Sequence, residues 1–156
     1  MLAVDLDSVK IKCARRNAEI YGVAERITFI CGNFFHVARA LLGSRPPNTG
    51  SHIDAVFLSP PWGGPTYLQQ LVFDLQRDMC PDGDSIMHWA SQLTPNICIF
   101  LPRNTSIKQL AEMAERYGVV VEGSHGKEEV KLEVEQNLLN KKLKTITAYL
   151  GYLLGQ

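Results

Sequence analysis

The sequence lacks several features that would point to particular classes of protein. No window contains the run of about eighteen apolar residues that a membrane-spanning helix requires. The four cysteines lie far apart and form no CxxC pair, and the four histidines are equally dispersed. Neither a disulfide framework nor a zinc site is therefore supported, and the cysteine usage indicates a reduced intracellular protein.

The chain also lacks an excess of charge of one sign, because sixteen basic residues balance sixteen acidic ones. Proteins that bind long stretches of nucleic acid usually show a basic excess. The composition thus argues against a long electrostatic footprint, and it leaves open the recognition of one nucleotide or one RNA end. Because the 156 residues are 46% apolar and 21% charged, we expect one globular domain over residues 1–156.

Two signals are missing near the N-terminus. No basic segment followed by an apolar one comes after Met1, so the sequence predicts no signal peptide. In a nucleotide-binding fold, a glycine-rich GxGxxG-type loop should precede an acidic strand end by roughly twenty residues. Only four residues precede Asp5. Either the fold does not bind a nucleotide or the chain starts after the first strand of its domain.

Apolar runs alternate with helical patterns along the chain. Strands are predicted at 2–6, 27–31, 53–58 and 96–101, and helices at 8–21, 34–42, 84–93 and 106–117. Two further strands, at 131–138 and 143–152, are joined by a short link and predict an antiparallel hairpin. This order is typical of an α/β protein with a Rossmann-like, doubly wound, mostly parallel sheet and an antiparallel C-terminal hairpin at one edge. The polar segment 43–52 is the expected surface insertion.

Ligands of doubly wound sheets bind outside the carboxyl ends of the strands. Polar or aromatic residues follow four of the predicted strands, namely Asp5 and Asp7, Asn33 and Phe34, Ser59 through Trp62, and Pro102 through Asn104. We expect these strand ends to face a single crevice. An acidic residue at such an end commonly accepts hydrogen bonds from both hydroxyls of a ribose. Asp5 fits that role and Asp7 fits a helix cap, while the alternative makes both carboxylates caps or solvated turn residues.

The segment Ser59-Pro60-Pro61-Trp62 is the most informative stretch of the sequence. Two prolines fix φ and remove two N–H donors, which leaves carbonyls and the serine hydroxyl as acceptors at a strand end. Rigid acceptors beside an aromatic ring suit the exocyclic amino group of a planar base that stacks on the ring. In the structural alternative, the segment is a proline-stiffened loop and Trp62 fills the edge of the core.

The sequence around this segment resembles that of one family of enzymes. Asp/Asn/Ser-Pro-Pro-aromatic is the signature of S-adenosylmethionine-dependent methyltransferases that act on amino groups of bases. The matching stretches are VDLD at 4–7, NAEIYGVAERITFICGNF at 17–34, SPPWGGP at 59–65, FLPRN at 100–104 and EQNLLNKKLKTITAYLG at 135–151. Together they resemble the methyltransferase domain of the trimethylguanosine synthase family. The resemblance runs from residue 2 to 151, with interruptions at 43–52 and 123–130.

The resemblance implies a set of residues that bind S-adenosylmethionine. Asp5 matches the acidic residue that holds the ribose of this cofactor. Asn33 and Phe34 match the site beside its adenine, where relatives usually have Asp-Phe. Ser59 also matches a position at the cofactor. An asparagine at position 33 brings no charge, so weaker cofactor binding is expected.

The resemblance also implies a set of residues that bind and position the substrate, the m7G cap of an RNA. Ser59 and Pro60 match the catalytic residues next to the guanine N2. Trp62 matches the ring that stacks on m7G. Tyr67 and Arg103 match positions near the cap phosphates. No histidine of the sequence stands out as a general base, and no metal is implied.

The activity implied by the resemblance is methyl transfer to the exocyclic N2 of the m7G cap of small nuclear and nucleolar RNAs, which yields the 2,2,7-trimethylguanosine cap. It implies a nuclear location, in nucleoli and Cajal bodies, as well as a cytoplasmic one. Ribonucleoprotein proteins are possible further partners, and no membrane is involved. Two alternatives are another RNA or DNA amino-group methyltransferase, and a catalytically inactive cap-binding or interaction module.

Relatives carry an upstream strand with a glycine-rich loop that this sequence does not contain. We therefore expect a fold without its first strand, and activity of this chain by itself stays open. Other features are interpreted as structural: Cys31, Cys98 and Trp89 as core residues, and the lysines at 141, 142 and 144 as a solvated turn or edge protection that could also touch RNA.

Overall fold

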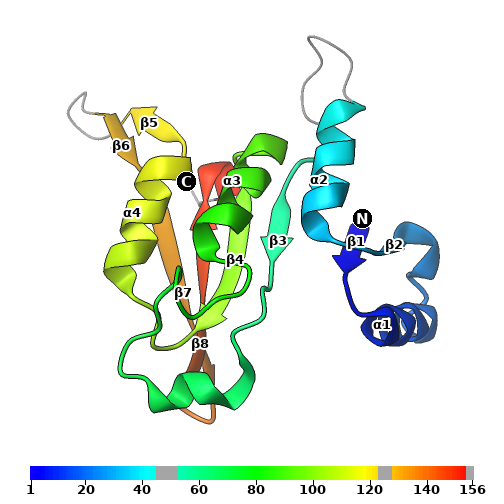
Figure 1. Ribbon diagram of the computed structural model, residues 1–156, viewed down its shortest axis with the longest axis horizontal. Coiled ribbons are helices and arrows are strands. Elements are labelled where there is room, and N and C mark those ends of the chain that lie inside the picture. Colours follow the sequence, from blue (N-terminus) through cyan, green and yellow to red (C-terminus); the bar gives the residue numbers. More distant parts are fainter. Residues whose placement is uncertain (45–52, 123–127, 154–156) are drawn as a thin grey trace. The chain divides into compact units, whose positions relative to one another are not determined.

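The computed structural model describes residues 1–44, 53–122 and 128–153 (Figure 1). The chain divides into two compact units, Met1–Pro46 and Pro47–Gln156, and each is described by itself. The named strands form three sheets: β1-β2, β3-β4-β8-β7 and β5-β6. None of the helices in the described ranges is long and apolar enough to span a membrane. The predicted insertion at 43–52 lies almost wholly outside the described residues.

The first unit contains β1 (Leu2–Asp5), α1 (Ser8–Ile20), a short 3-10 turn η1 (Ala24–Arg26), β2 (Thr28–Cys31) and α2 (Phe34–Gly43). Strands β1 and β2 are parallel, and Asp5 pairs with Cys31 at their carboxyl ends. Asp7 begins α1 as its N-cap, because its side chain accepts the N–H groups of Val9 and Lys10. This capping role confirms the prediction for Asp7.

Helix α1 ends in a Schellman arrangement. Gly22 adopts a φ of 67°, which an L side chain rarely tolerates. Its N–H donates to the carbonyl of Glu19 at 3.1 Å, and the N–H of Val23 donates to that of Ala18 at 2.9 Å. The chain therefore turns sharply toward β2 without leaving these carbonyls unpaired.

The second unit is built around one mixed sheet. Strand β3 (Val56–Leu58) runs parallel to β4 (Ile97–Pro102), and β4 pairs on its other side with the antiparallel β8 (Lys142–Leu150). Strand β7 (Leu132–Leu139) pairs antiparallel with β8 and forms the edge. The predicted C-terminal hairpin at one edge of the sheet is thus confirmed.

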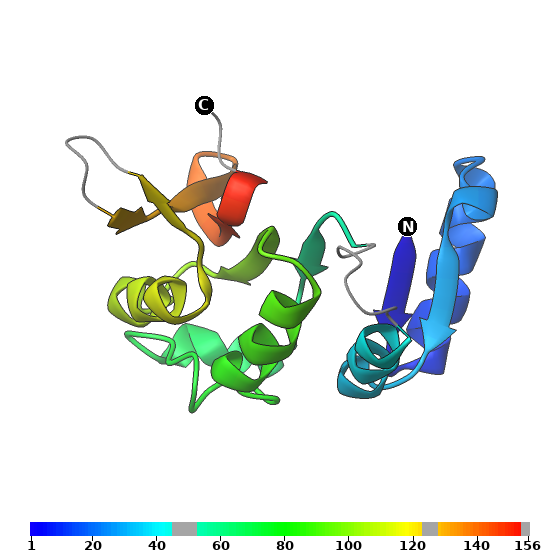
Figure 2. The same ribbon diagram turned by 90° about the horizontal axis from the view of Figure 1, so that it is seen from above.

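Helices α3 (Gly83–Leu93) and α4 (Ile107–Tyr117) lie along the same face of this sheet (Figures 1 and 2). Alternate residues of β4 and β8 meet on one face and are all buried: Ile97 with Leu150, Ile99 with Ala148, and Leu101 with Ile146. Full burial of such a side chain contributes roughly 1.5–3 kcal/mol relative to its exposed state. The β4–β8 ladder is therefore the centre of the core.

Five findings differ from the predictions made from the sequence. The strand predicted at 53–58 covers only Val56–Leu58, because the carbonyl of Asp54 accepts side-chain hydrogen bonds from Thr94 and Asn96. Cys31 is exposed, since it is the last residue of β2 in a two-stranded sheet.

The third finding concerns the segment after α4. It forms a second antiparallel pair, β5 (Val120–Glu122) and β6 (Glu128–Val130), which the sequence analysis did not predict. Cys98 is only half-buried, although burial raises the pKa of its thiol. Trp89 is also half-buried rather than fully enclosed.

Gly151, directly after β8, yields a first testable prediction. It has a φ of 79°, and an added Cβ would clash with the backbone carbonyl of Pro95. Gly64, in the same unit, has a φ of 69° but open space around the same position. We expect Gly64→Ala to lower the free energy of unfolding by roughly 1 kcal/mol, the cost of the backbone conformation alone. Gly151→Ala should cost roughly 2–4 kcal/mol, because the clash adds to this cost. Urea unfolding followed by circular dichroism measures both, and equal losses would contradict the packing role.

Candidate functional site

In the first unit, the polar groups expected to bind a cofactor lie at the carboxyl ends of β1 and β2. Asp5 is half-buried, and its Oδ1 accepts the N–H of Asp7 at 2.8 Å. Its backbone carbonyl accepts the N–H of Gly32 at 3.0 Å, which holds the two strand ends together. One carboxylate oxygen of Asp5 is thus committed to the turn, and Oδ2 has no hydrogen-bond partner among the described residues.

Asn33 begins α2 as its N-cap, a role that the sequence analysis did not assign. Its Oδ1 accepts the N–H of Phe35 at 2.8 Å. The half-buried ring of Phe34 packs against that of Phe35 with centroids 5.7 Å apart. Asp5 and Asn33 thus flank one edge of the β1–β2 pair, as predicted from their places in the sequence.

In the second unit, Trp62 follows β3 and packs against β4. Its Nε1–H donates to the carbonyl of Phe100 at 3.3 Å, and the two ring centroids are 5.2 Å apart at an interplanar angle of 38°. The indole is half-buried. These contacts agree with the structural interpretation, in which Trp62 packs on the sheet. They also hold the indole in a defined orientation beside Pro60, which is half-buried, and Ser59, which is exposed.

Tyr67 completes a small aromatic cluster with Trp62 and Phe100. It lies in the 3-10 helix η2 (Gly64–Gln69), which was not predicted. Its ring meets that of Trp62 edge-on, with centroids 5.9 Å apart and an interplanar angle of 84°. Edge-to-face contacts of this kind are worth roughly 0.5–1.5 kcal/mol beyond burial. The cluster therefore joins the segment after β3 to the surface of β4.

Asn104 anchors this cluster, and the sequence analysis missed its role. Its Nδ2 donates to the carbonyls of Tyr67 at 3.0 Å and of Gln70 at 2.9 Å. Its own carbonyl accepts the N–H of Phe73 at 2.8 Å. The buried Oδ1 of Asn104 has no hydrogen-bond partner in the described part of the chain. The sequence signal for Asn104 is its place directly after β4, in the FLPRN stretch beside Arg103.

Arg103 follows β4 and remains exposed. Its Nη1 donates to the carbonyl of Leu143 at 3.3 Å, so the guanidinium lies against the β7–β8 hairpin. No carboxylate of the described residues forms an ion pair with it. Within those residues, Arg103 is therefore not part of a surface ion pair.

The second unit thus brings Trp62 and Tyr67 together and places Arg103 at the end of the same strand that carries Phe100. The expectation that all four strand ends face one crevice involves both units and stays a prediction. Among residues 1–44, 53–122 and 128–153, no group of three or more His, Cys, Asp or Glu side chains is placed to hold a metal ion.

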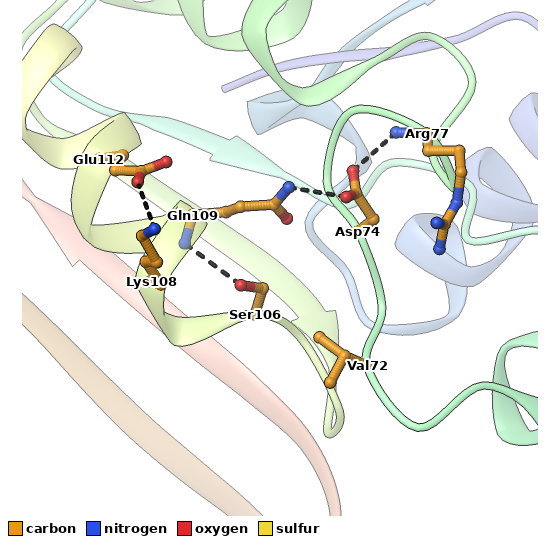
Figure 3. A pocket seen from close by; sticks show the side chains of 7 residues that line it. All are labelled: Val72, Asp74, Arg77, Ser106, Lys108, Gln109 and Glu112. Carbon is orange, nitrogen blue, oxygen red and sulfur yellow. Dashed lines mark hydrogen bonds and ion pairs between the residues drawn. The ribbon is translucent and has the colours of Figure 1, made fainter.

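A separate pocket of about 420 Å³ lies beside the start of α4 (Figure 3). Its lining residues are Val72, Asp74, Arg77, Ser106, Lys108, Gln109 and Glu112. Asp74 accepts hydrogen bonds from the backbone N–H of Arg77 at 2.9 Å and from Nε2 of Gln109 at 2.8 Å, and Gln109 accepts the N–H of Leu75 at 3.0 Å. The polar groups of this pocket therefore pair with one another, and they fasten the 72–78 loop to α4.

The same loop contains a carboxylate that makes the stability of this unit pH-dependent. Side-chain hydrogen bonds from Arg77, helped by the backbone N–H of Asp74, lower the pKa of Asp78 to about 2. Because the folded pKa lies below the ordinary value near 3.9, the stabilisation is present above about pH 4 and is lost as the pH falls toward 2.

We expect Asp78→Asn to lower the thermal midpoint at pH 7 and to flatten its decline between about pH 5 and pH 2. Asp54→Asn is the matched control in the same unit, since that side chain is exposed. Thermal melts at a series of pH values provide the comparison. An unchanged pH profile for Asp78→Asn would show that this carboxylate is not coupled to folding.

Comparisons with known proteins agree with the geometry described above. Two solved structures of the METTL16 methyltransferase domain are similar in fold, with TM-scores of 0.61 and 0.55 at 17% and 15% identity. The similarity covers 97% and 95% of this chain, and 50% and 48% of the two METTL16 chains. The α/β fold is therefore that of a methyltransferase domain, as predicted.

Two curated relatives are trimethylguanosine synthases, from Schizosaccharomyces pombe and Saccharomyces cerevisiae. Each is 36% identical, over 113 and 114 residues, which cover 71% and 72% of this chain. The match spans 45% and 35% of the relatives' own lengths, less than half in each case. The model of the RNA cap guanine-N2 methyltransferase family matches residues 1–153. The chain belongs to the RNA cap guanine-N2 methyltransferase family.

Proposed function

We propose that the protein transfers a methyl group from S-adenosylmethionine to the exocyclic N2 of an m7G cap. The observation that carries this proposal is the segment Ser59–Trp62, which the fold holds at the carboxyl end of β3 with its indole oriented on β4. Family membership supplies the reaction, and this segment supplies residues suited to it. Repeated transfer yields the 2,2,7-trimethylguanosine cap, the product that gives the curated relatives their name.

The first unit offers groups that fit S-adenosylmethionine. The free carboxylate oxygen of Asp5, at the end of a parallel strand, can accept hydrogen bonds from ribose hydroxyls. The Oδ1 of Asn33 can take a second donor, the adenine amino group, while it caps α2. Phe34 adds an apolar surface for the adenine ring. These residues would hold the cofactor.

Trp62 would recognise the methylated base. N7-methylguanine is cationic, so its stacking on an indole includes a cation–π attraction of about 0.5–2 kcal/mol. Unmethylated guanine lacks this charge, which explains a requirement for prior N7 methylation. The hydrogen bond to Phe100 and the edge contact with Tyr67 fix the plane of the indole before the base arrives. Less rotational freedom is then lost on binding.

Ser59 and Pro60 would orient the guanine N2. The serine hydroxyl and the backbone carbonyls can accept the two N2 hydrogens, which favours a pyramidal amine with its lone pair available. Bound S-adenosylmethionine supplies an electrophilic sulfonium methyl, toward which the N2 lone pair is aimed. The N2 lone pair would form the new N–C bond as the S–C bond breaks, the sulfur would keep that bond's electron pair and leave as a neutral thioether, and N2 would lose a proton to solvent. Of the histidines that the structure describes, His36 and His88 lie exposed on helices, so this scheme assigns orientation to the described residues and no base role to either histidine.

Arg103 and Tyr67 would bind the phosphates of the cap. The guanidinium is exposed and keeps donors beyond the one given to Leu143, so it can fork onto phosphate oxygens. Lysine could not reproduce this bidentate geometry. The tyrosine hydroxyl can donate a further hydrogen bond to the same groups. Asn104 positions Tyr67 through the backbone and does not contact the substrate in this scheme.

Capped small nuclear and nucleolar RNAs are the proposed substrates, with ribonucleoprotein proteins as further partners. An enzyme that processes these RNAs acts in the nucleus, including nucleoli and Cajal bodies, and cytoplasmic substrates are part of the same proposal. The similarity to trimethylguanosine synthases supports this assignment.

Calorimetric titration with m7GDP and with GDP tests the proposal, after circular dichroism has established that the protein is folded. We expect a preference for m7GDP that Trp62→Leu reduces roughly tenfold, because leucine keeps apolar contact and lacks the ring quadrupole. Trp62→Phe should retain part of the preference. Trp89→Phe, on helix α3, is the control that should leave it intact. Equal binding of m7GDP and GDP by the wild type would contradict cap recognition.

Methylation assays separate the proposal from its alternatives. If m7GDP competes with a capped oligonucleotide and itself accepts a methyl group, the base is the cap guanine. Methylation of another base without such competition indicates a different amino-group methyltransferase. Binding of m7GDP without binding of S-adenosylmethionine indicates a cap-binding module.

Asn33→Asp provides a prediction about cofactor affinity. One oxygen of an aspartate would keep the cap on Phe35, and the other would accept from the adenine amino group with a full charge. Charge-assisted hydrogen bonds are roughly twice as strong as neutral ones, so we expect S-adenosylmethionine to bind about fivefold tighter. Asn17→Asp, on the exposed face of α1, adds the same charge as a control. Unchanged affinity in Asn33→Asp would mean that position 33 does not contact the adenine.

A further inference from the structure

The tip of the β7–β8 hairpin carries a cluster of lysines that the proposed cap site does not use. Lys141, Lys142 and Lys144 are all exposed. None of their ammonium groups forms an ion pair with another described residue. We call these three residues the tip lysines. Unpaired charges in such a group repel one another and attract anions.

The turn places Lys141 in a backbone conformation that is strained for a residue with a side chain. Strand β7 ends at Leu139 and pairs there with Lys142, so Asn140 and Lys141 form a two-residue turn. Their φ values are 52° and 60°. Asn-Gly is the favoured pair for such turns, because glycine adopts positive φ without strain. The sequence places a long cationic side chain where glycine would fit better.

A bulge beside the turn presents a second lysine. Asn137 pairs with Thr145, whereas the next residue, Leu138, pairs with Leu143. Lys144 is therefore the extra residue on β8 and has no partner across the hairpin. Bulges of this kind bend the strand and redirect a side chain.

The hairpin tip adjoins the residue proposed to bind the cap phosphates. The guanidinium of Arg103 donates to the carbonyl of Leu143, which lies between Lys142 and Lys144. The β4–β8 ladder ends with the pair Pro102–Thr145. Arg103, directly after β4, and Lys144, on β8, are the next residues beyond this pair. The tip lysines therefore continue the positive charge of Arg103 along the hairpin.

Protection of the β7 edge does not account for these lysines. The edge strand of this sheet is β7, yet Lys142 and Lys144 lie on β8. The exposed charges of β7 itself are acidic, at Glu133 and Glu135. Glu135 accepts a hydrogen bond from the hydroxyl of Tyr149 at 2.7 Å.

We propose that the hairpin tip, with Lys141, Lys142 and Lys144, binds the phosphates of the RNA nucleotides that follow the cap. This inference rests on the proposed function, because the cap must lie near Arg103. A short single-stranded tract fits the charge, since three lysines suit about three phosphates. It also fits the zero net charge of the chain, which argues against a long footprint.

Binding of m7GDP and of an m7G-capped oligoribonucleotide of ten nucleotides tests the inference. The variant is K141Q/K142Q/K144Q, and the matched control is K10Q/K12Q/K131Q, which removes the same charge at exposed positions elsewhere. We expect the wild type and the control to bind the capped oligonucleotide at least tenfold tighter than m7GDP at low salt. The variant should lose this gain and keep its affinity for m7GDP.

The salt dependence gives a second readout. The slope of log K against log salt for single strands changes by about 0.7 for each phosphate contact. Removing the tip lysines should therefore lower the slope for the oligonucleotide by about 2, with no change in the slope for m7GDP. A merely solvated turn would leave both slopes unchanged.

Lys141→Gly keeps the inference testable if the triple variant folds poorly. Because glycine suits the positive φ, this variant should have a thermal midpoint no lower than the wild type. Its affinity for the oligonucleotide should nevertheless fall by a factor of about three. Stability and RNA affinity would then be separated at one residue.

Three results would overturn the inference. They are equal affinity of the wild type for m7GDP and the capped oligonucleotide, equal loss in the variant and its control, and failure to bind the oligonucleotide at all. With either of the first two results, selective binding of m7GDP over GDP would still support the proposed function. Tight oligonucleotide binding that needs the tip lysines, without any preference for m7GDP over GDP, would support the tip and contradict the cap site.

Discussion

The hydrogen-bonded ladder on both sides of β4 is the constraint on which the second unit depends. Its pairing with β3 sets where Ser59 and Trp62 emerge, and its pairing with β8 sets where the hairpin lies. The strand is buried along alternate residues, so a shift of register by one would expose its apolar side. The ends of three strands are thereby fixed relative to one another, and the anchor formed by Asn104 adds Tyr67 to the proposed cap site.

Charge is segregated in this unit although the whole chain is neutral. The tip lysines and Arg103 gather at one end of the β8 strand, while Glu133 and Glu135 lie further along β7. The net charge of a chain therefore bears on the length of an expected nucleic-acid contact, and it does not show where charge gathers locally. Such local positive charge also raises the rate of encounter with a polyanion at low salt.

Much of the fold could be predicted from the sequence because apolar periodicity and local caps agree. Asp7 caps α1 as expected, Ser106 caps α4 at the start of the predicted helix, and the hairpin follows two alternating runs. The β5–β6 pair was missed because those strands are three residues each, too short for a periodic signal.

The site was predicted less completely, for a related reason. Trp62 and Arg103 stand out by residue type and by their place at strand ends, whereas Asn104 acts through contacts 34 and 37 residues away in the chain. Asn33 forms a helix cap in addition to the cofactor role that its position suggested. Local sequence shows that such a side chain is polar, and only the folded chain shows which hydrogen-bond partners it meets.

The contacts of Asn104 have a consequence for how the sequence can vary. Its amide bonds to main-chain carbonyls at positions 67 and 70, so the side chains at those positions are not needed for the anchor. A substitution at position 70 can therefore leave the anchor intact, while the anchor itself requires an amide at position 104. The anchor uses the main chain of Tyr67, so the hydroxyl of this residue is not needed for it and is left for the ligand.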